Sequence, residues 1–217
     1  MKQLCVFDLD GTLINSLPDI ASALNGALAH FCLPGFSLEE YRRKVGNGAK
    51  CLCARCLPEG KEALLPELLA EYDRRYIRAC ASDTAPFPGI PELLCKLRDA
   101  GIKTAIISNK PHPQTLEVLS SVLAGIPFDL ALGQREGIPL KPAPDALLET
   151  LHTLFIPPED TLYIGDSPED VRFGKAAGVD TCAVLWGYRD KEELEEAGPD
   201  HLAARPADIL RFAGVNT

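Results

Sequence analysis

One stretch near the start of the chain decides the fold: Leu4-Cys5-Val6-Phe7-Asp8-Leu9-Asp10-Gly11-Thr12. Its short apolar run stops at an acidic, glycine-containing segment, which predicts a buried strand that ends in a loop. Ligands of open α/β sheets bind at that end of a strand. Either Asp8 or Asp10 alone could be the acid of a turn or a helix cap. Burying two carboxylates on alternate residues is costly, so together they predict a bound cation or a reaction.

Apolar runs of the same kind recur along the chain, with helical patterns between them. The runs cover residues 103–108, 161–165 and 181–185, with a weaker one at 128–132. Helical patterns cover residues 91–100, 113–123, 144–155 and 168–177. Strand and helix in alternation predict an α/β fold, a doubly wound parallel sheet with helices on both faces.

Residues 16–81 break this alternation and contain no convincing strand. Helices are predicted there at 17–31, from Leu38 onward and at 61–80, and Ser37-Leu38-Glu39-Glu40 has the spacing of a capping box. The segment 85–89, rich in proline and glycine, marks the return of the sheet pattern. We therefore expect residues 1–14 and 85–217 to form an α/β core domain, and residues 15–84 to form an inserted helical unit.

The composition excludes several classes of partner. A net charge of −9 repels polyphosphate backbones, so we expect no nucleic acid and no anionic membrane as partner. No stretch approaches the roughly 18 apolar residues of a membrane span, and the first residues show no apolar signal region, which predicts a cytoplasmic protein. Eight cysteines in that compartment predict reduced thiols rather than disulfides.

Three of these cysteines, Cys51, Cys53 and Cys56, lie close together in the sequence. A zinc site would need a fourth ligand, which no nearby histidine or cysteine pair supplies. We expect them to be small, mostly buried side chains on a helix.

Three further motifs place polar side chains at the carboxyl end of a predicted strand or just before a helix. They are Ser108-Asn109-Lys110, Lys141-Pro142-Ala143-Pro144-Asp145 and Gly165-Asp166-Ser167-Pro168-Glu169-Asp170. Each is weak alone, but together they share one edge of the sheet. Carboxylates suit Mg²⁺ with a substrate phosphate, and a carboxylate can also be a nucleophile. A hydroxyl and an ammonium can hold phosphoryl oxygens, so the set predicts phosphoryl transfer.

Taken in order, the motifs resemble those of the haloacid dehalogenase superfamily, in its phosphoglycolate-phosphatase-like branch, over essentially the whole chain. The resemblance rests on Asp-x-Asp-Gly-Thr at 8–12, Ser108, Lys141-Pro142 and Gly-Asp-x-x-x-Asp at 165–170. It implies a Rossmann-like core with an inserted helical cap domain. It also implies a phosphatase that depends on Mg²⁺ and passes through a phospho-aspartate.

The resemblance assigns roles to the acidic residues. Asp8 would be the nucleophile, and Asp10 would be the general acid and base. Mg²⁺ would be held by Asp8, the main-chain carbonyl of Asp10 and Asp166. Asp170 would be a further ligand or an outer partner.

The same resemblance assigns the substrate contacts of the core. Ser108 and Lys141 would hold the phosphoryl group, and Lys141 would also orient the nucleophile. Gly11, Thr12 and Asn109 would give main-chain or secondary contacts.

In the cap, the resemblance makes the loop at residues 45–50 the part that faces the substrate. Its glycines would let backbone amides approach an anion, and nearby basic side chains would add charge. The alternative is a plain turn between two helices. The residues concerned are Arg43, Gly46, Asn47, Gly48 and Lys50.

The motifs leave two other functions open. A phosphosugar mutase of the same superfamily would use the same phospho-aspartate without net hydrolysis, although Thr12, where such mutases often carry valine, favours a phosphatase. A non-catalytic binding module on the same fold could have lost one of the motif side chains, and none is lost. The expected substrate is a small phosphorylated metabolite, with phosphoglycolate the leading candidate. The expected assembly is a monomer or a homodimer.

Overall fold

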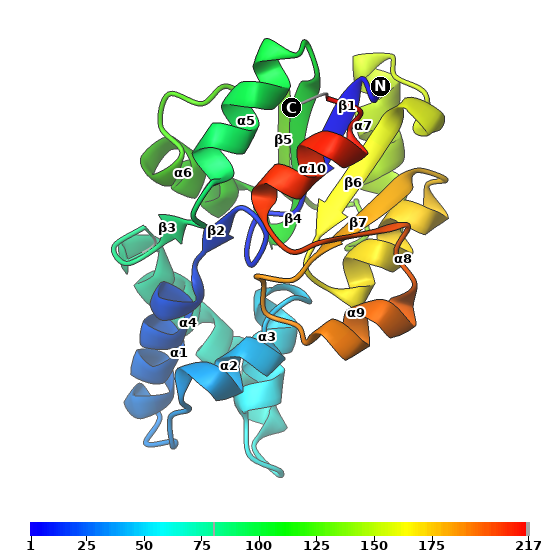
Figure 1. Ribbon diagram of the computed structural model, residues 1–217. Coiled ribbons are helices and arrows are strands. Elements are labelled where there is room, and N and C mark those ends of the chain that lie inside the picture. The colour runs from blue at the N-terminus through cyan, green and yellow to red at the C-terminus, as the bar shows by residue number, and fades with distance from the viewer. Residues whose placement is uncertain (80, 216–217) are drawn as a thin grey trace.

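The computed structural model describes residues 1–79 and 81–215 and shows a parallel sheet with helices on both faces and a helical unit beside it (Figure 1). The strands are β1 Leu4–Phe7, β2 Ile14–Asn15, β3 Ala85–Pro86, β4 Lys103–Pro111, β5 Leu130–Gln134, β6 Thr161–Gly165, β7 Asp180–Val184 and β8 His201–Ala203. The α-helices are α1 Leu17–His30, α2 Leu38–Lys44, α3 Gly48–Cys56, α4 Leu65–Ala79, α5 Ile90–Asp99, α6 His112–Val122, α7 Asp145–Leu154, α8 Pro168–Ala176, α9 Lys191–Ala197 and α10 Pro206–Phe212. Short 3₁₀ helices are η1 Glu62–Leu64 and η2 Pro158–Asp160.

The main sheet has the strand order β5-β4-β1-β6-β7-β8, and every neighbouring pair is parallel. Strand β1 lies in the middle, with Leu4 opposite Lys103 of β4 on one side and Thr161 of β6 on the other. The predicted parallel α/β sheet is confirmed. The short edge strand β8 was not predicted.

Helices cover both faces of this sheet, which explains why β1 is apolar throughout. Cys5 and Phe7 pack with residues of α5, α6 and α10 on one face. Leu4 and Val6 pack with residues of α7 and α8 on the other. The carboxyl end of β1, where Asp8 begins, is therefore held between two apolar layers.

A helical insert that includes α2, α3 and α4 follows the first strand. It packs around a core of its own with α1, which includes Leu24, Tyr41 and Tyr76. The strands β2 and β3 pair antiparallel, with Ile14 opposite Pro86, so the chain enters and leaves the insert at one place. Figure 1 shows the insert, in blue to cyan, below the sheet. The domain boundaries at residues 14/15 and 84/85 stay a prediction.

The local structure of the insert follows its sequence in part. The capping box at the start of α2 is present, since Ser37 and Glu40 each accept a hydrogen bond from the other's backbone. The helix predicted at 61–80 is split into η1 and α4, and Cys80 lies outside the described residues. Among residues 1–79 and 81–215, no helix has both the length and the apolar character needed to cross a membrane.

The cysteine cluster lies on α3, as expected, but its side chains differ in environment. Cys53 and Cys56 are buried, whereas Cys51 is exposed. Burial raises the pKa of the Cys53 thiol to about 12 and that of Cys56 to about 11. These two thiols are therefore protonated near neutral pH and pack as small apolar groups.

Candidate active site

A cavity of about 50 Å³ lies where the carboxyl edge of the sheet meets the helical insert. Side chains of the sheet edge form one wall, and residues of α1, α3, α4 and the loop before α3 form the other. The lining residues are Asp8, Asp10, Ile20, Val45, Gly46, Gly48, Ala49, Leu52, Tyr72, Ser108, Asn109, Lys110, Pro111 and Gln114.

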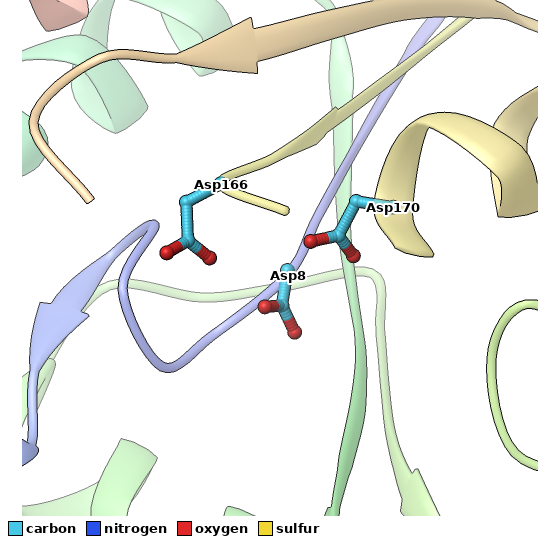
Figure 2. A group of neighbouring side chains, drawn as sticks. All are labelled: Asp8, Asp166 and Asp170. Atoms are coloured by element: carbon cyan, nitrogen blue, oxygen red, sulfur yellow. The ribbon is translucent and has the colours of Figure 1, made fainter. Parts of the chain in front are cut away.

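Three buried carboxylates gather at this edge, and Figure 2 shows them near one another. Asp8 follows β1, Asp166 follows β6, and Asp170 lies in the first turn of α8. One oxygen of each lies within 4.8 Å of the others. Burial raises the pKa of Asp8 well above its usual range and that of Asp166 to about 7. The three carboxylates offer only oxygen atoms as metal ligands, and their negative charges are costly to bury. The cluster therefore fits a hard divalent cation such as Mg²⁺.

Lys141 supplies a positive charge to this cluster. Its Nζ lies 2.7 Å from Asp8 Oδ1 and 2.7 Å from Asp170 Oδ1, and it donates to the Tyr163 hydroxyl at 3.1 Å. Burial alone would lower the pKa of Lys141, but Asp170 and Asp8 outweigh it and raise that pKa well above its usual value. The side chain is therefore a fixed ammonium that holds Asp8 in place.

Both carboxylate oxygens of Asp170 accept hydrogen bonds from neighbouring groups. Oδ1 accepts from Lys141 and from the Tyr163 hydroxyl, at 2.7 and 3.0 Å. Oδ2 accepts from the backbone N–H and the hydroxyl of Ser167, at 3.1 and 2.6 Å, which completes the capping box of α8. This carboxylate thus joins the start of α8 to Lys141.

The second acid of the first motif, Asp10, faces a lysine that was not predicted as a site residue. Lys110 Nζ donates to Asp10 Oδ1 and Oδ2 at 2.9 and 3.0 Å, and Ser16 Oγ donates to Oδ1 at 2.5 Å. The Lys110 ammonium also lies 4.7 Å from the ring centre of Tyr76 on α4. Burial would lower the pKa of Lys110, but Asp10 outweighs it, so the pKa is raised. The sequence did contain a signal for Lys110, because this residue is part of the Ser108-Asn109-Lys110 motif.

Ser108 and Asn109 both line the cavity and lie inside β4, which continues to Pro111, beyond the predicted strand end at Ser108. Ser108 Oγ accepts from the Lys110 N–H at 3.2 Å. Asn109 Oδ1 accepts from the Lys141 N–H at 2.9 Å, and its amide donates to the carbonyl of Gly46 at 3.4 Å. Asn109 therefore ties β4 to the Lys141 loop and to the insert.

Gly11 and Thr12 lie behind the cavity, against Asp166. Gly11 has φ +89°, and a Cβ there would come 2.3 Å from Asp166 Oδ2. Thr12 Oγ1 donates to Asp166 Oδ1 at 3.4 Å. The backbone N–H of Tyr188, which the motifs did not point to, donates to Asp166 Oδ2 at 2.7 Å. These contacts fix the rotamer of Asp166.

Of the five insert residues predicted to face the substrate, only Gly46 and Gly48 line the cavity. Arg43 is exposed and lies 3.9 Å from Glu39. Asn47 accepts from the Arg55 guanidinium at 2.6 Å. Lys50 lines a separate groove on the surface of the insert.

One arginine of the core holds the loop that carries these glycines. Arg189, beyond β7, donates to the backbone carbonyls of Arg42, at 2.7 Å, and of Val45. The carbonyls at the end of α2 have no partner within their own helix, so a guanidinium there satisfies them. The loop before α3 is thus fixed to the core through both Arg189 and Asn109.

Comparison with known proteins identifies the family of this chain. A family model described as haloacid dehalogenase-like hydrolase matches residues 5–184. A phosphoglycolate phosphatase of Aquifex aeolicus is 33% identical over 210 residues, which is 97% of this chain and 96% of that protein. Phosphoglycolate phosphatase 1 of Pseudomonas aeruginosa is 33% identical, over 98% of this chain and 80% of its own. A crystal structure from Lactobacillus delbrueckii subsp. bulgaricus has a TM-score of 0.93 at 29% identity, covering 98% of this chain and 99% of that one.

Proposed function

The chain belongs to the haloacid dehalogenase-like hydrolases, and on that premise we propose that it is a Mg²⁺-dependent phosphatase of a small phosphorylated metabolite. The observation that carries the proposal is the buried cluster of Asp8, Asp166 and Asp170 beside Lys141. Three carboxylates against one ammonium leave an excess of negative charge. A divalent cation that also receives a phosphate explains why such a cluster is buried.

In the proposed reaction, Asp8 Oδ attacks phosphorus and the bond from phosphorus to the ester oxygen breaks. Asp10 gives its proton to the departing alcohol and then takes a proton from water. That water attacks the phospho-aspartate, which releases inorganic phosphate and restores Asp8. Lys141 and Ser108 hold the phosphoryl oxygens while charge builds up on them.

We propose that Asp8, Asp166 and the main-chain carbonyl of Asp10 hold Mg²⁺. When bound, the ion offsets the negative charge of the carboxylates and of the phosphoryl group. Asp170 would act through Lys141, because hydrogen bonds already engage both of its oxygens. Gly11 and Thr12 would keep Asp166 in its ligating rotamer.

The substrate is proposed to be small, with phosphoglycolate the leading candidate. The cavity of about 50 Å³ is well below the roughly 300–1,000 Å³ of pockets for drug-sized ligands. The two relatives quoted above are named as phosphoglycolate phosphatases. Residues 15–84 would then be the cap that closes over the phosphate, with Gly46 and Gly48 as its contact points.

A test separates the two aspartates of the first motif by role. Asp8→Asn should abolish both turnover and any covalent phosphoenzyme. Asp10→Asn should slow hydrolysis of alkyl phosphates by about 10²–10⁴-fold. An aryl phosphate needs little protonation on leaving, so with it the Asp10 variant should accumulate phosphate on Asp8. Single-turnover quench with mass analysis reads this directly. Phosphate on Asp10, or no phosphoenzyme during wild-type turnover, would contradict the mechanism.

A further inference from the structure

A single cationic side chain, Lys110, lines the cavity among the residues the structure describes there. The phosphate-binding Lys141 lies behind Asp8 and is outside this lining. Lys110 therefore marks a place where negative charge on the non-phosphate part of a ligand would be attracted.

The surroundings of Lys110 hold the ammonium in one position. Its side chain is 5% exposed, and its Nζ is fixed between both oxygens of Asp10 and the ring of Tyr76. An ammonium carries three N–H donors, and the two bonds to Asp10 use two of them. Among the described residues, no third oxygen accepts from Nζ, so a ligand oxygen would compete there with the Tyr76 ring alone.

The wall that faces Lys110 across the cavity is largely apolar. It is formed by side chains of the insert: Ile20, Val45, Ala49, Leu52 and Tyr72. An apolar wall excludes water and lowers the local dielectric, which strengthens an attraction between opposite charges. Apart from the Tyr72 hydroxyl, these side chains carry no donor or acceptor, so the wall lacks the several hydrogen bonds that a polyhydroxylated leaving group would need.

We propose that Lys110 is the residue that determines specificity, by binding a carboxylate on the leaving alcohol. The inference rests on the proposed function, in which Asp10 donates its proton to the ester oxygen. Lys110 Nζ lies 2.9 Å from Asp10 Oδ1, and therefore close to the ester oxygen that Asp10 would protonate. A group on the carbon that bears the ester oxygen then falls within reach of Lys110. The substrate class is then the phosphate monoester of a small hydroxy acid, with the carboxylate next to the ester carbon.

The test compares two small substrates of which only one carries this charge. Phosphoglycolate carries the carboxylate, and 2-hydroxyethyl phosphate carries a neutral hydroxymethyl group in its place. Wild-type protein with Mg²⁺ should show the higher kcat/KM for phosphoglycolate. Lys110→Met should reduce that preference by about 10- to 100-fold. This is the typical effect on binding of losing one hydrogen bond between charged groups. Lys110→Arg, which keeps the charge, should retain more of it.

The preference is a ratio measured within each variant, so a general loss of folded or active protein cancels. Lys61→Met removes one exposed positive charge from the same insert and should leave the ratio unchanged. A Lys110→Met variant that loses activity equally on both substrates, or a wild type without preference, would overturn the inference and leave the phosphatase intact. Absence of hydrolysis with these two and with an aryl phosphate would instead overturn the proposed function, and the inference with it.

Discussion

Replacing Lys141 by methionine removes the ammonium and leaves Asp8 and Asp170 without a cation. Each carboxylate oxygen lies 2.7 Å from Nζ, where the attraction is about 6 kcal/mol at an effective dielectric constant of roughly 20. Desolvation of the three groups cancels much of this. Removing one partner of a buried ion pair typically costs about 3–5 kcal/mol, and that loss in unfolding free energy is expected here in Mg²⁺-free buffer. Turnover should fall by about 10²–10³-fold as well.

The loss should depend on pH, with a sign that follows from Asp8. Burial raises the pKa of Asp8 above its value in the unfolded chain, and Lys141 opposes that rise. Without the lysine, the folded state binds more protons than the unfolded state, so stability falls as pH rises. The variant should therefore be closer to wild type at pH 6 than at pH 8, and Mg²⁺ should restore part of the difference.

Urea unfolding followed by circular dichroism measures these free energies. The matched control is Lys191→Met, which breaks an exposed ion pair of 3.2 Å to Glu195 and should cost about 0–1 kcal/mol. Equal losses in the two variants, or a Lys141→Met loss that is the same at both pH values, would refute the charge-balance argument.

Two further predictions concern the same site, and a third concerns the cysteine cluster of α3. The pKa of about 7 at Asp166 means that Mg²⁺ must displace a proton at low pH, so the rise in Tm on adding Mg²⁺ should be larger at pH 8 than at pH 6. Gly187→Ala would place a Cβ 2.2 Å from Asp166 Cβ, so it should weaken Mg²⁺ affinity in a calorimetric titration; unchanged affinity would show that Asp166 is not a ligand. A small alkylating agent on native protein should modify the exposed Cys51, spare the buried Cys53, and leave turnover largely intact. Inactivation without unfolding would show that a cysteine takes part in function, which the proposed mechanism does not include.

Local sequence determined the parallel sheet and most of its covering helices. The apolar run of β1 is apolar at every position because both of its faces are buried, and that signature is readable without knowing the partners. The capping box of α2 was also readable, since its hydrogen bonds join residues three apart. The family resemblance followed from the order of four short motifs, each of which is local.

The tertiary structure alone decided which side chains meet in the cavity. Lys110 and Asp10 are a hundred residues apart in the chain, and their ion pair exists because β1 and β4 are neighbours and the ring of Tyr76 lies over the ammonium. Arg43 and Lys50 have the charge that suits a phosphate, yet helix geometry turns both away from the cavity. The direction of a side chain is set by how the insert packs on the sheet edge, and no pattern within either segment encodes that packing.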